Sequence, residues 1–185
     1  MGKLILVTGG ARSGKSSFAE KYVAKYGKNI AYIATSQVLD EEMAYRVKLH
    51  RERRPENWQT FEAPKDAHAA ISEAGKTCDM ILFDCLTVYI SNILCGMDNL
   101  EDEELLFQTV KQQYELLLLA VGETEATVVI VTNEVGAGIV PMNKLARHFR
   151  DLAGLANQAM AKEAAEVYLV VSGMAVNVKK LAENL

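Results

Sequence analysis

The sequence predicts an α/β fold in which a mostly parallel central sheet lies between two layers of helices. Short apolar runs alternate with longer helical patterns along all 185 residues, as in such three-layer domains. These runs are continuously apolar, which is typical of strands covered on both faces. Between the first strand and the first helix, Gly9–Ser16 follows the P-loop spacing G-x-x-x-x-G-K-[ST]. Together these observations predict a P-loop NTPase-like (RecA-like) domain.

Five apolar segments are the predicted strands. They are Leu4–Val7, Ile30–Ala34, Met80–Phe83, Thr127–Val131 and Val167–Val171. Short connections between strands and helices favour right-handed crossovers, and therefore parallel neighbours. No linker or low-complexity tract divides the chain, so we expect one nucleotide-binding domain over residues 1–185.

Helical patterns fill the intervals between these strands. They cover Gly14–Tyr26, Glu41–Arg54, Ala67–Ala74, Leu86–Leu94, a stretch from the acidic run 101–104 to Val121, and Asn143–Ala165. Asp40 and Asp66 are the expected N-caps of the second and third helices, and Pro55 opposes continuation of the second. The fifth helix is predicted from apolar residues that recur every three or four positions, and its acidic start suits a helix N-terminus.

Composition excludes several classes of protein. The net charge of −4 argues against general binding to nucleic acids or membrane surfaces. The longest apolar stretch is far shorter than a membrane span, and the N-terminus lacks the pattern of a signal peptide. Cys78, Cys85 and Cys95 lack metal-ligand spacing and fit the reduced thiols of a cytoplasmic protein.

The P-loop residues indicate binding of a nucleoside triphosphate. A glycine-rich turn lets backbone N–H groups converge on phosphates at a helix N-terminus. We expect Lys15 to reach the β- and γ-phosphates and the Ser16 hydroxyl to hold Mg²⁺. Asp84 directly follows an apolar strand, where P-loop enzymes place a Mg²⁺-binding carboxylate. The alternative role for Asp84 is to cap the next helix.

A basic cluster surrounds His50 in this otherwise acidic chain. Its members are Arg46, Lys48, Arg51, Arg53 and Arg54. Guanidinium groups bind phosphate oxygens in bidentate geometry, and a neutral imidazole can attack phosphorus while arginines neutralise the charge. From spacing alone the alternatives stay open: a solvated charged face, and a structural role for His50.

A loop with two glycines, 133–141, follows the predicted strand Thr127–Val131. Open α/β sheets bind ligands at the carboxyl edge of their strands, so Asn133 and Glu134 are candidate site residues. The alternative is an ordinary connection between strand and helix. The chain lacks D-x-x-G at Asp84 and an N-K-x-D motif, which argues against a switch GTPase.

Six separated motifs cover almost the whole chain. They are Gly9–Ser16, Ala34–Gln37, the segment from His50-Arg51 through Arg54-Pro55 and Trp58 to Glu62, Thr132–Pro141, Arg147–Asp151, and Val170–Gly173. In combination they resemble the bifunctional adenosylcobinamide kinase / adenosylcobinamide-phosphate guanylyltransferase family of adenosylcobalamin synthesis. Such a combination is far more specific than a P-loop by itself.

This resemblance implies two reactions. ATP or GTP phosphorylates the aminopropanol hydroxyl of adenosylcobinamide, and GTP then donates GMP to that phosphate, giving adenosylcobinamide-GDP and pyrophosphate. The family forms a covalent GMP–histidine, and the matching residue is His50, because it opens His-Arg-x-x-Arg-Pro. The resemblance also implies a homotrimer with active sites near the subunit boundaries.

The resemblance further implies which residues bind nucleotide. They are Gly9, Gly10, Ala11, Arg12, Ser13, Gly14, Lys15, Ser16, Thr35, Ser36, Gln37, Arg51, Glu52, Arg53, Arg54, Glu62 and Asp84. Asp84 occupies a position where some relatives have Glu. Its side chain is shorter by one methylene, so its carboxylate lies closer to the backbone. Two alternative functions remain: a P-loop small-molecule kinase without a covalent intermediate, and a regulatory module that binds nucleotide without turnover.

Overall fold

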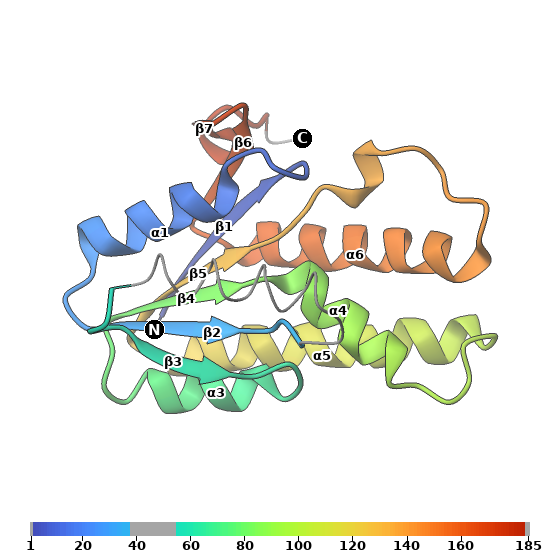
Figure 1. Ribbon diagram of the computed structural model, residues 1–185, viewed down its shortest axis with the longest axis horizontal. Helices are drawn as coiled ribbons and strands as arrows, with labels where there is room; N and C mark the ends of the chain where they lie inside the picture. The colour runs from blue at the N-terminus through green and yellow to red at the C-terminus, as the bar shows by residue number, and fades with distance from the viewer. Residues whose placement is uncertain (1, 38–54, 184–185) are drawn as a thin grey trace.

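A seven-stranded sheet forms the centre of the protein (Figure 1). The computed structural model describes residues 2–37 and 55–183. The strands are β1 (Lys3–Gly9), β2 (Ile30–Ala34), β3 (Gln59–Glu62), β4 (Met80–Asp84), β5 (Thr127–Val131), β6 (Glu166–Val171) and β7 (Met174–Asn177). They lie in the order β3-β2-β4-β5-β1-β6-β7, and every neighbouring pair is parallel except β6 and β7. The predicted mostly parallel sheet is therefore confirmed.

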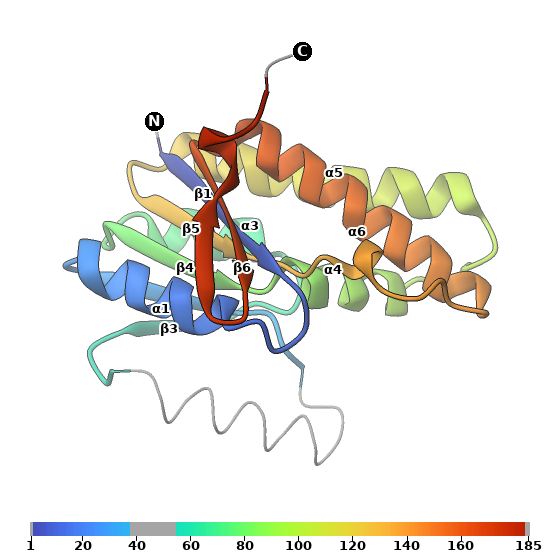
Figure 2. The same cartoon turned by 90° about the horizontal axis from the view of Figure 1, so that it is seen from above.

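Helices cover both faces of the sheet. Those described are α1 (Lys15–Tyr26), α3 (Ala67–Ala74), α4 (Leu86–Cys95), α5 (Glu103–Glu123) and α6 (Lys144–Glu163), with 3₁₀ turns η1 (Val135–Ala137) and η2 (Val178–Lys180). Figure 2 shows α1 on one side of the sheet and α5 and α6 on the other. No helix in the described part of the chain is long and apolar enough to cross a membrane.

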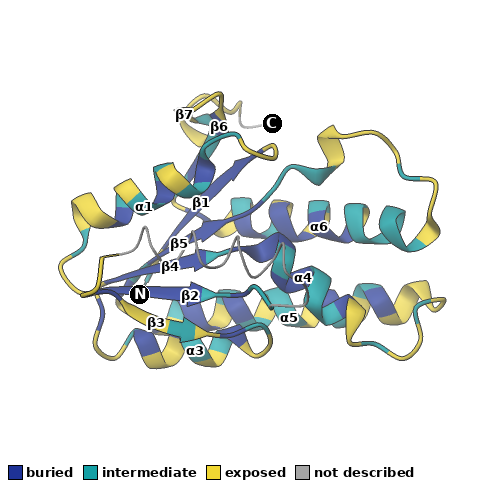
Figure 3. Ribbon diagram, in the orientation of Figure 1, coloured by how far each residue is buried: buried dark blue, intermediate teal, exposed yellow. Residues whose placement is uncertain are grey.

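The central strands bury side chains on both faces, which explains their continuous apolar sequence. In β1, Leu4 and Leu6 belong to the core beneath α3, α4, α5 and α6, whereas Ile5 and Val7 belong to the core beneath α1. Successive side chains of a strand point to opposite faces, so a doubly covered strand needs apolar residues at every position. Figure 3 shows this burial concentrated along the central strands.

All five predicted strands are present, and the structure adds two edge strands. β3 has the sequence Gln-Thr-Phe-Glu and is largely exposed, so it lacks the apolar signal of the central strands. β7 pairs with β6 across the two-residue turn Ser172-Gly173, where both residues have positive φ (50° and 80°). Such turns match the twist of a hairpin. The Ser172-Gly173 pair could therefore have indicated a hairpin, and with it the strand β7, which was not predicted from the sequence.

The helix starts confirm some predicted caps and correct others. Asp102 caps α5 by accepting a hydrogen bond from the Leu105 amide at 3.0 Å, in line with the predicted acidic start. The prediction that Asp66 caps α3 is wrong, because Asp66 adopts a left-handed conformation and its side chain makes no capping bond. The residue before α4 is Cys85, so Asp84 does not cap that helix. The predicted helix Glu41–Arg54 lies outside the described residues, with its cap Asp40.

Candidate nucleotide-binding site

The P-loop connects the end of β1 to the start of α1, as predicted. Two of its glycines are required by the local geometry. A Cβ atom at Gly9 would lie 2.4 Å from the Val170 carbonyl oxygen, and Gly14 has a φ of +96° with its Cβ position 3.1 Å from the Cα of Gly173. The Gly173 amide also donates to the Ser13 carbonyl at 2.8 Å. The hairpin of β6 and β7 therefore packs closely against the loop and helps to fix its shape.

Lys15 is the first residue of α1, and only 9% of its surface is exposed. Its ammonium Nζ donates to the Gly10 carbonyl at 3.1 Å, which draws the side chain back over the loop. Burial lowers the pKa of Lys15, while the nearby carboxylate of Asp84 opposes that shift. A cation held in this way would be stabilised by a phosphate group in the loop.

A cavity of about 960 Å³ opens beside the P-loop at the carboxyl edge of the sheet. Residues from the ends of β1, β2, β4 and β5 meet there, as expected of an open α/β sheet. Its lining includes nine of the predicted site residues: Gly10, Ala11, Arg12, Ser13, Gly14, Lys15, Ser16, Ser36 and Asp84. Residues far apart in the sequence are thus gathered around one space.

Asp84 is held at the end of β4 by Tyr32, whose hydroxyl donates to Oδ2 at 3.0 Å. Cys85 follows it and also lines the cavity. Burial, together with the neighbouring Asp84 carboxylate, raises the pKa of the Cys85 thiol to about 12. The thiol is therefore protonated at neutral pH and is not a nucleophile.

Ser16 and Asp84 offer a hydroxyl and a carboxylate oxygen to the same cavity. These are hard ligands suited to Mg²⁺. Within residues 2–37 and 55–183, no group of three or more His, Cys, Asp or Glu side chains could hold a metal ion. The residues present fit a P-loop arrangement, in which phosphate oxygens and water complete the coordination.

Other predicted residues lie away from this lining. Gly9 and Gln37 are not part of it, and Gln37 is the last residue described before the gap. The Thr35 side chain is fully buried and bonds the Cys85 backbone, accepting from its amide at 2.8 Å and donating to its carbonyl at 3.0 Å. Glu62 ends β3, which is separated from β1 by three strands.

The basic cluster lies outside the described residues. This applies to His50, Arg51, Glu52, Arg53 and Arg54, and also to Arg46 and Lys48. Their predicted roles in guanylyl transfer and phosphate binding therefore remain predictions.

Asn133 and Glu134, both candidates from the sequence, line the cavity. Among the lining residues that sequence reasoning did not identify are Tyr32 and Thr87. Tyr32 lies within an apolar strand, where nothing distinguishes it from a core aromatic. Thr87 lies in the first turn of α4, and its hydroxyl accepts a hydrogen bond from the Asn133 amide, a pairing that only the fold shows.

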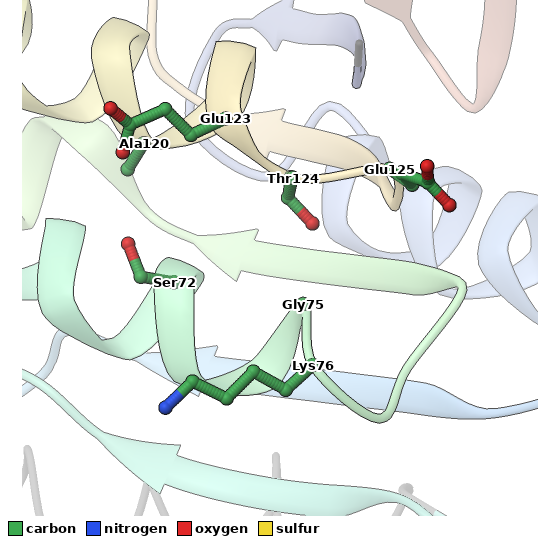
Figure 4. Close-up of a pocket in the computed structure, with 7 residues that line it drawn as sticks. All are labelled: Ser72, Gly75, Lys76, Ala120, Glu123, Thr124 and Glu125. Carbon is green, nitrogen blue, oxygen red and sulfur yellow. The ribbon is translucent and has the colours of Figure 1, made fainter.

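A second cavity, of about 400 Å³, lies near the opposite edge of the sheet. It is formed by the C-terminal ends of α3 and α5 and by Thr124 and Glu125, which precede β5 (Figure 4). Its lining has no P-loop residue. The larger cavity is therefore the candidate site for a nucleotide.

Comparison with known proteins agrees with this architecture. A family model described as cobinamide kinase / cobinamide phosphate guanyltransferase matches residues 5–178. The chain belongs to this family. The match begins within β1 and ends in η2, so it includes every residue assigned above to the larger cavity.

Curated members of the cobinamide kinase / guanyltransferase family are similar over nearly their full length. The bifunctional adenosylcobalamin biosynthesis protein CobU of Salmonella typhimurium is 44% identical over 181 residues, covering 95% of this chain and 99% of the relative. CobU of Escherichia coli is 45% identical with the same coverage. CobP of Pseudomonas aeruginosa is 37% identical, covering 94% of this chain and 96% of the relative.

A solved structure supports the fold independently. The crystal structure of the RadB recombinase matches with a TM-score of 0.50 and 16% identity, covering 90% of this chain and 73% of that chain. Identity this low shows a shared fold only. It confirms the predicted RecA-like P-loop architecture for this member of the cobinamide kinase / guanyltransferase family.

Proposed function

We propose that this protein catalyses two successive transfers in adenosylcobalamin synthesis. It first phosphorylates adenosylcobinamide, using ATP or GTP, and it then attaches GMP from GTP to the resulting phosphate. The observation that carries the proposal is the cavity that joins the P-loop to Asp84 in a chain of this family. The printed names of the curated relatives, which are bifunctional proteins of the same biosynthesis, support it.

In the first transfer, the P-loop amides and Lys15 bind the triphosphate. The acceptor hydroxyl attacks the γ-phosphorus, and the bond from that phosphorus to the β–γ bridging oxygen breaks, releasing the nucleoside diphosphate. Lys15 neutralises charge that develops on the phosphates. Ser16 and Asp84 would hold Mg²⁺, which supplies further charge neutralisation when it is bound.

In the second transfer, an imidazole nitrogen of His50 attacks the α-phosphorus of GTP. A phosphorus–nitrogen bond forms and pyrophosphate leaves. An oxygen of adenosylcobinamide phosphate then attacks the same phosphorus, and the bond to nitrogen breaks. Arg51, Arg53 and Arg54 neutralise the phosphate charges during both displacements.

One experiment tests the proposal as a whole. The protein is incubated with adenosylcobinamide, GTP and Mg²⁺, and the products are identified by mass. We expect adenosylcobinamide phosphate followed by adenosylcobinamide-GDP. A protein that forms only the phosphate would be the monofunctional kinase, and one that binds GTP without any corrinoid product would be a regulatory module. Either result would contradict the proposal.

A labelling experiment tests the covalent step. GTP carrying radioactive α-phosphate should label the wild-type protein, and the label should be labile in acid and stable in alkali, as a phosphoramidate is. His50→Ala should abolish the label while the protein still binds GTP. His68→Ala provides the matched control and should label normally. Label that persists in His50→Ala would remove His50 from the role.

The proposal extends to the setting of the enzyme. We assign it to the cytoplasm on the basis of its cysteines, which fit reduced thiols, and to a homotrimer on the basis of the family resemblance described above. Light scattering of the purified protein tests the trimer, and a monomeric mass would contradict it.

A further inference from the structure

Two carboxylates line the cavity within the described residues, and the proposed function uses one of them. Asp84 is the metal-ligand candidate, whereas Glu134, three residues after β5 in the loop that follows that strand, has no role in the mechanism above. Phosphoryl transfer to a hydroxyl also requires a group that positions the nucleophile and accepts its proton. Lys15 and Arg12 cannot serve while they are protonated.

Glu134 is fixed next to the first residues of the P-loop. Its amide donates to the Gly9 carbonyl at 3.2 Å, and its carboxylate Oε1 accepts a hydrogen bond from the buried Thr8 hydroxyl at 2.5 Å. Thr8 and Gly9 are the last residues of β1. The Glu134 carboxylate is therefore held at the point where the phosphate-binding loop begins.

The residue before Glu134 is equally constrained. The Asn133 amide donates to the Thr87 hydroxyl at 2.8 Å, and its carbonyl accepts from Asn157 Nδ2 at 3.0 Å. Thr87 lies in α4 and Asn157 in α6, and both are buried. Two helices and the P-loop strand thus fix the backbone that carries Glu134, which is the preorganisation that a catalytic group requires.

We propose that Glu134 is the general base of the kinase reaction. This inference rests on the proposed function and adds a residue to it. Glu134 accepts the proton of the aminopropanol hydroxyl while that oxygen forms its bond to the γ-phosphorus and the nucleoside diphosphate leaves. Oε1 is bonded to Thr8, and we assign Oε2 to the proton.

The second transfer needs no such base. Its nucleophiles are a neutral imidazole nitrogen and an already ionised phosphate oxygen, so no hydroxyl proton has to be removed. Loss of the Glu134 carboxylate should therefore impair only one of the two activities, and the enzyme provides its own internal control.

The test compares the two half-reactions in Glu134→Gln. The amide oxygen of glutamine can still accept the Thr8 hydroxyl, so the variant preserves the local hydrogen bond. With adenosylcobinamide and ATP, we expect kcat for phosphorylation to fall about 100-fold or more, the range typical of a lost general base. With adenosylcobinamide phosphate supplied, GMP transfer should stay within about 2-fold of wild type, and so should the Kd for GTP.

Two further variants complete the comparison. Glu134→Asp keeps a base with shorter reach and should retain more phosphorylation than Glu134→Gln. Glu125→Gln removes a carboxylate from the second cavity (Figure 4) and should change neither half-reaction.

Several outcomes would overturn the inference. Unchanged phosphorylation in Glu134→Gln would place the base elsewhere. An equal loss of both half-reactions, or weaker GTP binding, would make Glu134 a nucleotide-binding or structural residue. If the wild-type protein has neither activity, the proposed function itself is wrong, and so is the assignment of Glu134 as its general base.

Discussion

At the scale of single residues, the site depends on groups whose surroundings differ from water. Lys15 shows this most clearly, because its side chain is buried and its ammonium donates to a backbone carbonyl. Burial disfavours its charged form and lowers its pKa. Lys15 therefore costs stability in the free protein, and we expect it to contribute affinity when a triphosphate binds.

This conflict predicts that Lys15→Met separates binding from stability. GTP should bind about 10- to 100-fold more weakly, since a charge-assisted hydrogen bond to phosphate is lost. The free protein should be at least as stable as wild type at pH 7, because a buried charge is removed. Calorimetric titration and thermal melts measure the two effects. Lys21→Met, an exposed lysine of the same helix, is the control and should alter neither.

The sign of the pH dependence follows from the lowered pKa. Between the folded pKa of Lys15 and its ordinary value of 10.5, the unfolded chain binds more protons than the folded one. The stability penalty is thus fully present below the folded pKa and is relieved as pH rises toward 10.5. The advantage of Lys15→Met should shrink in alkaline melts, and an advantage that grows with pH would contradict the argument.

At the scale of elements, helices on one face of the sheet position the polar end of β5. The Thr132 hydroxyl donates to Asn157 Oδ1 at 2.7 Å and lies 3.1 Å from the Thr87 hydroxyl. Asn157 Nδ2 also donates to the Asn133 carbonyl. One side chain of α6 therefore bonds two polar groups at the strand end, the buried Thr132 hydroxyl and the Asn133 carbonyl, and so fixes the start of the loop that carries Glu134.

We predict that Asn157→Leu lowers the free energy of unfolding by about 1 to 3 kcal/mol, because buried polar groups at the end of β5 lose their partner. The phosphorylation rate should fall as well, since the backbone before Glu134 is released. Denaturant titration and the kinase assay check these effects. Gln158→Leu, at the exposed neighbouring position, should leave both unchanged. Wild-type stability in Asn157→Leu would show that water replaces the amide.

At the scale of the whole molecule, strands and loops distant in sequence are assembled around the P-loop. The hairpin of β6 and β7 supports that loop from one side through Gly173, and β5 supports it from the other through Glu134. A ligand bound there contacts elements from both halves of the chain. Nucleotide binding should therefore stabilise the fold as a unit.

We expect GTP with Mg²⁺, at about 100 times its Kd, to add about 2.7 kcal/mol of stability. For a chain of this length that corresponds to a rise in Tm of about 5 to 10 °C. Thermal melts should show the same rise for wild type and His50→Ala, if His50 acts in chemistry rather than in initial binding. Lys15→Met at the same GTP concentration should lose about half of the rise or more, as expected of a Kd raised about 10- to 100-fold. A His50→Ala protein that GTP fails to stabilise would make His50 a binding residue.

Much of the fold and part of the candidate site could be predicted from local sequence. The central strands were predictable because burial on both faces requires continuous apolar runs, and the P-loop because its glycines and lysine must occupy fixed positions along the chain. Asp84 was predictable from its place after such a run. The edge strand β3 could not be predicted in this way, since a largely exposed strand has few apolar residues. The prediction that Asp66 caps α3 failed because capping depends on backbone dihedrals, which the residue type does not fix.

By itself, the sequence determined the fold class, the P-loop and the family, because each depends on residue type and spacing along the chain. Only the tertiary structure decided that Thr35 bonds the backbone of Cys85, that Tyr32 holds Asp84, and that Glu134 is bonded to the strand leading into the P-loop. Those contacts join residues about 50 to 126 positions apart. Pairing of that kind depends on strand order and register, which no local pattern of side chains encodes.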